Sequence, residues 1–118
     1  MPTTGLIGPF KLDANTIASH LLSPSAGAYA LGRINDAGSF AVAYVGRADT
    51  GLAKRLEEHA ASGHYSEFQY GYFRTAQAAF LHECQMYHDY LPRGLDNKAH
   101  PERPQGTDWK CPRCAIYL

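Results

Sequence analysis

The chain has 118 residues, 45% of them hydrophobic, and its 11 basic and 11 acidic side chains give a formal net charge of zero. This length predicts one domain with one modest core, and the composition argues against a disordered chain. Without a basic surplus, the protein cannot hold nucleic acid by its overall charge, so any such contact has to come from a local patch.

The first part of the chain predicts a short helix and then a β-hairpin. Asp13 can cap a helix within residues 11–22, where apolar side chains recur at helical spacing. Two strand-like runs, GAYALGRI and SFAVAYVG, occupy residues 27–34 and 39–46, and the intervening NDAG suits a tight turn. We therefore expect a hairpin whose second strand ends at Gly46.

A helix and a third strand are expected after the hairpin. Asp49 or Thr50 can cap a helix in which Leu52 and Leu56 face the core. Residues 67–73, EFQYGYF, alternate as a half-buried strand does. Three aromatic side chains share one face of this strand, and we assign them to packing rather than to base stacking: Phe68, Tyr70 and Tyr72.

A long helix is expected over residues 76–91, capped by Thr75 and ended by Pro92 and Gly94. Its apolar stripe consists of Ala79, Phe80, Cys84, Tyr87 and Leu91. Glu83 falls inside this stripe, and an unpaired buried carboxylate is costly. Glu83 therefore needs a partner, and a salt bridge to Arg55 and a metal-binding role fit the spacing equally well.

The segment 93–118 contains three prolines and two cysteines and has no regular period. Such a segment cannot stand as a free loop in a compact domain, so something has to hold it. The order of elements predicts an α/β (α+β) fold, a small central antiparallel three-stranded sheet flanked by helices. We expect one domain over residues 1–118, with a helical extension (1–26), a core (27–97) and a tail (98–118).

Cysteine and histidine spacing predicts a structural zinc site that pins the tail. Cys84 and His88 lie four residues apart on the long helix, and Cys111 and Cys114 form a Cys-x-x-Cys knuckle. Two ligands from a helix and two from a knuckle suit tetrahedral Zn²⁺. His100 is an alternative fourth ligand, and three free cysteines in a reduced cytosol are the simpler alternative to any metal.

The sequence gives no sign of a membrane or secreted protein. No apolar run approaches the ~20 residues of a membrane span. The first residues, MPTTGLIGPFKLD, lack the charged and apolar regions of a signal peptide. We therefore expect a cytoplasmic location and no membrane partner.

An ordered set of residues resembles the paired motifs of the GIY-YIG nuclease superfamily. The set consists of Gly27-Ala28-Tyr29, Tyr44-Val45-Gly46, Arg47, Arg55, Glu83 and Asn97. The resemblance covers residues 27 to about 97, and Ala28 departs from the usual Ile, Val or Leu. Arg55 is followed four residues later by His59, which is similar to the restriction-enzyme branch of that family.

The resemblance implies a divalent-metal-dependent endonuclease that acts on DNA. Glu83 would hold one Mg²⁺ or Mn²⁺, and the Arg55 guanidinium would neutralise charge on the phosphate. Tyr29 would act as general base or orient the water, and Tyr44 would position the phosphate or share the proton. Asn97 is carried over with the set as a site residue.

A phenol that acts as a base needs nearby positive charge, because its free pKa is near ~10. We expect Arg47 and Arg55 to lower the pKa of Tyr29 and His59 to take the proton onward. The alternative function is a non-catalytic, zinc-stabilised nucleic-acid-binding or adaptor domain on the same scaffold.

Overall fold

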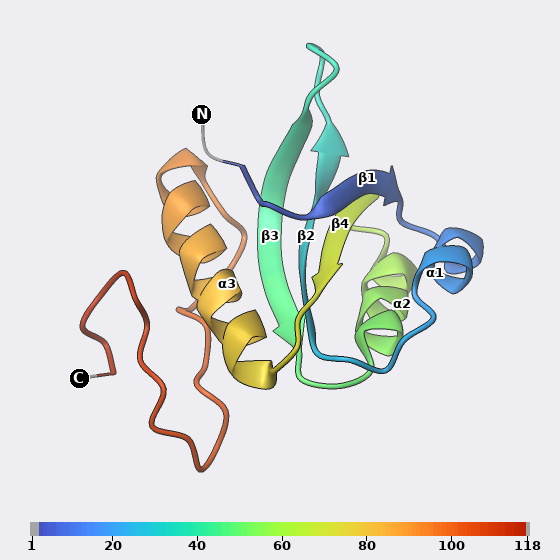
Figure 1. The fold of residues 1–118 in the computed structure, drawn as a ribbon. Coiled ribbons are helices and arrows are strands. Elements are labelled where there is room, and N and C mark those ends of the chain that lie inside the picture. The colour runs from blue at the N-terminus through green and yellow to red at the C-terminus, as the bar shows by residue number, and fades with distance from the viewer. Residues whose placement is uncertain (1–2, 118) are drawn as a thin grey trace.

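The structure, a computed structural model that describes residues 3–117, has a four-stranded antiparallel sheet with helices on both faces (Figure 1). In chain order its elements are β1 (Ile7–Lys11), α1 (Ala14–His20), β2 (Gly27–Ile34), β3 (Phe40–Ala48), α2 (Leu52–Ser62), β4 (Glu67–Tyr72), α3 (Ala76–Tyr90) and the 3-10 turn η1 (Leu91–Arg93). Helices α1 and α2 pack on one face of the sheet and α3 packs on the other. The predicted α+β fold is therefore confirmed.

The sheet has one strand more than the sequence predicts. Its order is β1-β4-β2-β3, and β1 pairs antiparallel with β4 at one edge. Strand β1, IGPFK, is mostly exposed and carries Gly8 and Pro9 side by side, so it lacks the alternation that identifies a half-buried strand. The N-terminal segment is thus a strand followed by a helix rather than a helical extension alone.

Two of the three predicted helix N-caps are observed in the structure. Asp13 accepts a hydrogen bond from the Thr16 N–H (2.8 Å) at the start of α1, and Thr75 accepts one from Ala78 (3.0 Å) at the start of α3. The N-cap of α2 is Gly51 rather than Asp49 or Thr50. Asp49 does not cap because its carboxylate binds Arg47, and β3 continues past Gly46 to Ala48.

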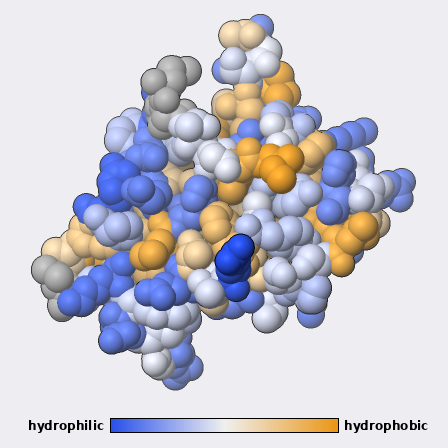
Figure 2. Space-filling view, viewed as in Figure 1, coloured by the Kyte–Doolittle hydropathy of each residue, from blue (hydrophilic) through white to orange (hydrophobic). Residues whose placement is uncertain are grey.

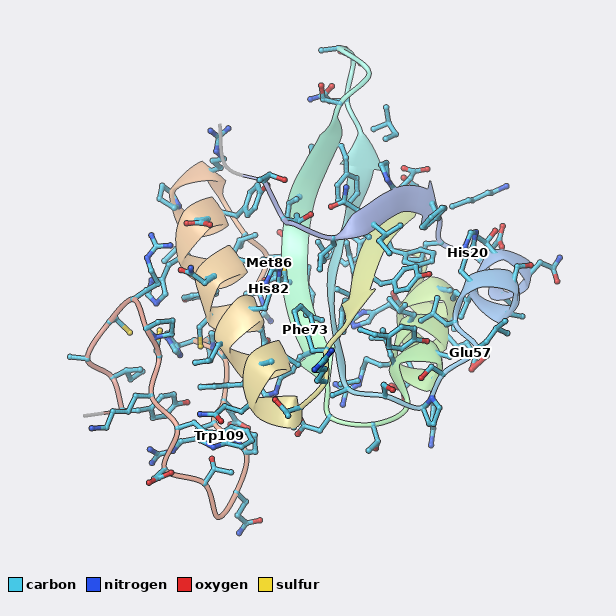
Figure 3. All side chains as sticks on the ribbon, in the orientation of Figure 1. His20, Glu57, Phe73, His82, Met86 and Trp109 are labelled. Carbon is cyan, nitrogen blue, oxygen red and sulfur yellow. The ribbon has the colours of Figure 1, made fainter. Side chains whose placement is uncertain are left out.

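The core lies on both faces of the central strands β2 and β3. On the α1 and α2 face, Leu52 and Leu56 are fully buried against Tyr29, as predicted. On the α3 face, Met86 packs against alanines of β2, and Figure 3 shows its side chain pointing from α3 toward the sheet. The predicted α3 stripe is wrong at Leu91, which is 42% exposed because α3 ends at Tyr90, and it leaves out the buried Met86 and Tyr90.

The tail runs beside the outer side of α3 (Figure 1). Trp109 lies near one end of α3 (Figure 3), and its ring is 6.2 Å from that of Phe80. Arg113 forms an ion pair with Asp89 at 2.5 Å and donates a hydrogen bond to Gln85. The irregular segment is therefore anchored on the helix, as its length requires.

Among residues 3–117, no helix combines the length and the apolar character that a membrane crossing needs. On the face drawn in Figure 2, hydrophobic residues form separate small groups rather than one continuous patch.

Candidate active site and metal centre

A polar cleft of about 480 Å³ opens beside β3. Six of the seven side chains to which the resemblance gives a site role line it: Tyr29, Tyr44, Arg47, Arg55, Glu83 and Asn97. They come from β2, β3, α2, α3 and the segment that follows η1. The seventh, His59, contacts Tyr29 directly without lining the cleft. Residues that are up to 68 positions apart in the sequence thus meet in one place.

The edge position of β3 lets both faces of the sheet contribute to this cleft. Tyr29 and Tyr44 lie on the face covered by α2. Arg47 lies on the opposite face, where its guanidinium sits 5.1 Å from the centre of the Phe80 ring on α3. Because β3 has a sheet neighbour on one side only, side chains from both faces reach its outer edge.

Gly27 and Gly46, the glycines of the two motifs, have no room for a side chain because other atoms approach them closely. A Cβ on Gly46 would lie 2.5 Å from the Oη and Cζ atoms of Tyr29, so the missing side chain is what lets the Tyr29 ring cross β3. A Cβ on Gly27 would lie 2.6 Å from Leu52 Cδ2 and 2.8 Å from the Gly71 carbonyl oxygen. Gly27 therefore admits the first turn of α2, which carries Arg55 and His59.

Replacing Gly46 by alanine should displace the Tyr29 ring and lower the free energy of unfolding by about 1–3 kcal/mol, the usual cost of overpacking a filled site. Denaturant unfolding measures this change. The matched control is Gly71→Ala on β4, whose added Cβ would meet the end of the Leu6 side chain at 3.0 Å and Phe73 Cε2 at an ordinary contact distance of 3.8 Å. Equal stability of the two variants would contradict a packing role for Gly46.

Arg55 and His59 both reach the Tyr29 hydroxyl. The Tyr29 Oη lies 3.0 Å from His59 Nε2, and Arg55 is its second hydrogen-bonding neighbour. The ring of Tyr44 packs against the other side of His59, with ring centres 5.3 Å apart. The four-residue spacing on α2 therefore places a guanidinium and an imidazole on one phenol.

Burial governs the protonation of this pair. It raises the pKa of Tyr29 well above the ordinary value, with Tyr44 adding to the rise and Arg55 opposing it. The expectation that arginines lower the pKa of Tyr29 is therefore wrong for the protein without substrate, because desolvation outweighs the charge of Arg55. Burial and the charge of Arg55 lower the pKa of His59, so the imidazole is neutral at pH 7 and can accept a proton.

Glu83 is buried on α3 and forms an ion pair with Arg47, not with Arg55. The Arg47 Nη1 donates to Glu83 Oε1 at 2.7 Å, while its Nε donates to Asp49 Oδ1 at 3.1 Å. Arg55 instead lies 3.7 Å from Glu58 on its own helix. Burial raises the pKa of Glu83 to about 7, against the lowering effect of the Arg47 hydrogen bond. A buried carboxylate at a polar cleft wall is chemically suited to bind a hydrated cation.

Asn97 binds the edge strand through both ends of its amide. Its Oδ1 accepts from the Val45 N–H at 3.0 Å, and its Nδ2 donates to the Val45 carbonyl at 2.8 Å. The neighbouring Asp96 N–H donates to the Ala43 carbonyl. Asn97 therefore caps the free edge of β3 and fixes the segment that closes the cleft, which is a positioning role.

The second cluster contains His88, His100, Cys111 and Cys114, whose ligand atoms all lie within 4.8 Å of one another, so it can hold a metal ion. The distance from His88 Nε2 to His100 Nε2 is 3.3 Å, and from His100 Nε2 to Cys114 Sγ it is 3.4 Å. Tetrahedral bonds of the lengths usual for zinc would separate two nitrogens by about 3.3 Å and a nitrogen from a sulfur by about 3.5 Å.

Neighbouring backbone groups prepare two of these ligands. The His100 Nδ1 hydrogen-bonds with the Pro101 carbonyl at 2.9 Å, so it carries the proton and leaves Nε2 with a lone pair toward the cluster. The Arg113 N–H donates to Cys111 Sγ at 3.4 Å, which orients this sulfur. This donor set fits a metal with nitrogen and sulfur ligands.

His100 takes the place that the helix spacing assigns to Cys84. Cys84 is fully buried and packs with Phe80 and Cys111, outside the cluster of ligand atoms. Burial strongly raises the pKa of the Cys84 thiol, and the adjacent Cys111 adds to that rise. The predicted ligands His88, Cys111 and Cys114 come together, and the alternative ligand His100 completes the set.

Sequence analysis missed two acidic residues of the cleft, Asp49 and Glu102. Asp49 could have been found, because it follows Arg47 by two positions at the end of a strand and so points to the same side. Glu102 could not, because nothing local in the sequence indicates that the tail returns to β3.

Comparison with known proteins identifies no relative of this chain. No family model matches it. No curated protein and no solved structure matches it either.

Proposed function

We propose that this protein is a GIY-YIG-type, divalent-metal-dependent endonuclease that hydrolyses phosphodiester bonds in DNA. The proposal rests on one observation, the meeting of Tyr29, Tyr44, Arg55 and Glu83 in a single polar cleft. A domain that only binds nucleic acid has no need for two phenols, a guanidinium and a buried carboxylate at one point. The motif spacing in the sequence supports the same function.

Each side chain has a role that its position supports. The Tyr29 hydroxyl orients the attacking water and passes a proton to His59 Nε2, which lies 3.0 Å away. Arg55, whose side chain is half exposed, offers its fork of donors to the scissile phosphate. Tyr44 positions the phosphate from the other side of His59. Arg47 holds Glu83 in place.

The charges in the cleft argue that a cation is needed. Its lining contains two arginines, Arg47 and Arg55, and three carboxylates, Asp49, Glu83 and Glu102. Arg47 is already paired with two of these carboxylates, so its charge is not free to neutralise an anionic phosphate. Glu83 would hold one Mg²⁺ or Mn²⁺, which supplies charge neutralisation for the phosphate and an acidified water.

The direct test is nicking of supercoiled plasmid DNA in the presence of Mg²⁺ or Mn²⁺, with EDTA as the metal-free control. Arg55→Lys should lose about 10²-fold in rate, because an ammonium cannot reproduce the guanidinium fork. The neighbouring exposed Lys54→Arg is the matched control and should keep the wild-type rate. Binding of DNA without any cleavage would favour a non-catalytic nucleic-acid-binding or adaptor domain instead.

We further propose that the metal of the His/Cys cluster is zinc and that its role is structural. Two imidazole nitrogens and two thiolates form a closed tetrahedral set without an open position, which is typical of structural zinc sites. The three cysteines form no disulfide, which favours a reducing compartment. We therefore also propose that the protein works in the cytoplasm.

Purified, reduced protein should carry about one zinc per chain, as a closed four-ligand site does. Chelation should lower the free energy of unfolding by about 2.7 kcal/mol relative to protein at a free zinc concentration of about 100 Kd. Metal analysis and thermal unfolding measure the two effects. Cys111→Ser should lose the metal, whereas Cys84→Ala, at the fully buried neighbour outside the cluster, should keep it. Loss of zinc from Cys84→Ala but not from His100→Ala would show that Cys84, as the helix spacing predicts, and not His100 is the fourth ligand.

A further inference from the structure

The metal centre and the cleft share a wall. The cleft is lined on its tail side by Ala99, His100, Pro101 and Glu102, and His100 is also a member of the His/Cys cluster. We refer to residues 99–102 as the cleft wall. His100 directs Nε2 toward His88 and Cys114, and the same residue lines the cleft.

Hydrogen bonds hold the cleft wall at both of its ends. At its start, Asn97 is fixed to Val45 on the edge of β3 by two hydrogen bonds. Lys98 and Ala99 are exposed, and the next anchored side chain is His100 at the metal centre. Beyond it, the buried Pro101 accepts hydrogen bonds on its carbonyl from the Tyr117 hydroxyl at 2.8 Å and from His100 Nδ1 at 2.9 Å.

Several contacts of the tail do not involve residues 99–102. Arg113 binds Asp89 and Gln85 on the outer side of α3, and Trp109 packs on Phe80. The Arg103 guanidinium stacks 4.7 Å above the Tyr117 ring, within the tail itself. At His100 the wall contacts α3 in two ways: His100 Nε2 lies 3.3 Å from His88 Nε2 in the cluster, and the His100 ring packs edge-on against Tyr87 with ring centres 5.3 Å apart.

We infer that metal binding at the His/Cys cluster fixes the cleft wall and thereby controls access to the cleft and its shape. The metal draws His100 to His88 on α3 and so sets the height of residues 99–102 above Glu83 and Arg47. Loss of the metal removes the bond at His100 and leaves the wall held by Asn97, by Tyr117 and by the packing of the His100 ring against Tyr87. The regulatory part of this inference rests on the proposed nuclease function, whereas the structural part does not.

The test uses two ligand variants whose side chains do not line the cleft, His88→Ala and Cys114→Ser. Amide hydrogen exchange of the full-length protein, with and without added Zn²⁺, measures protection of residues 95–102. We expect exchange in this segment to become much faster in both variants and in chelated wild type, while β2 and β3 keep their protection. Arg113→Gln is the matched control, because it removes the Asp89 ion pair and leaves all four ligands in place.

Plasmid nicking with Mg²⁺ forms the second arm. Zinc-free variants should cleave about tenfold more slowly than zinc-loaded wild type, because a misplaced wall misplaces the phosphate. Unchanged exchange of residues 95–102 on zinc removal would overturn the inference. Altered exchange with no cleavage by any form would leave the wall coupling standing and reject the nuclease. Cleavage that is equal with and without zinc would leave the nuclease standing and reject the regulation.

Discussion

Glu83→Gln is expected to abolish metal-dependent DNA cleavage, with a loss of about 10³-fold or more, while the protein stays folded. The glutamine amide oxygen can still accept the hydrogen bond from Arg47 Nη1, which is 2.7 Å long in the wild type. An uncharged amide is a much poorer Mg²⁺ ligand than a carboxylate, so the several kcal/mol that a metal contributes to phosphate hydrolysis should disappear. Plasmid nicking and Mg²⁺ titration of the variant measure the effect.

Two further variants separate this role of Glu83 from its structural role. Glu83→Ala should destabilise the fold by about 3 kcal/mol as well, because it leaves the nearly buried Arg47 with Asp49 as its remaining acidic partner. Asp49→Asn removes the other, more exposed carboxylate and should leave cleavage largely intact. Undiminished nicking by Glu83→Gln would reject Glu83 as the metal ligand. Equal losses in Glu83→Gln and Asp49→Asn would show that Arg47, rather than a metal, is the group that matters.

The parts of the site that depend on local sequence were predictable. Strand alternation places Tyr29 and Tyr44 in neighbouring strands, and the capping residues Asp13 and Thr75 mark the starts of two helices. Arg55 and His59 share a helix face because they are four residues apart. Such features are fixed within one element or one hairpin, and a single sequence contains them.

The parts of the site in which distant segments of the chain meet in space were not predictable in the same way. Helical spacing offers Cys84 and His88 as a ligand pair, but α3 buries Cys84 in the core and leaves His88 at the margin where the tail passes. The fourth ligand, His100, arrives because Asn97 binds the edge of β3 and turns the chain back. No local pattern encodes that hydrogen bond.

The ion-pair partner of Glu83 was also predicted wrongly. The sequence-based interpretation considered Arg55 and overlooked Arg47. Strand parity alone places Arg47 on the face opposite Tyr29, because Gly46 pairs with Tyr29 and adjacent residues alternate. That face is covered by α3, which carries Glu83.

The predicted direction of the pKa shift of Tyr29 was wrong for a different reason. Desolvation raises this pKa, and desolvation depends on packing that a sequence does not display.

The second large effect is expected at the Tyr29–His59 pair. Tyr29→Phe keeps the ring that Gly46 accommodates but removes the hydroxyl, and cleavage should fall by about 10²- to 10⁴-fold, the contribution of a positioned acid–base group. His59→Ala removes the proton acceptor and should cost about 10²-fold. Because the two side chains form one relay, the double variant should be no slower than Tyr29→Phe alone.

The pH dependence tests whether His59 accepts a proton. Only the neutral imidazole can do so, and the pKa of His59 lies below its ordinary value because of burial and the charge of Arg55. At saturating Mg²⁺, which keeps Glu83 ionised although burial raises its pKa to about 7 in the metal-free protein, the wild-type rate should hold at neutral pH and fall as pH drops through a value below ~6.5. His59→Ala should remove this acid limb, whereas the exposed His64→Ala should keep it and move it upward, because His64 contributes to lowering the pKa of His59. The charged and titratable groups that act on His59 are Arg55, Glu58, His64 and its ring neighbours Tyr29 and Tyr44. An acid limb that survives in His59→Ala would assign it to another group and leave Arg55 as the working member of the helix pair.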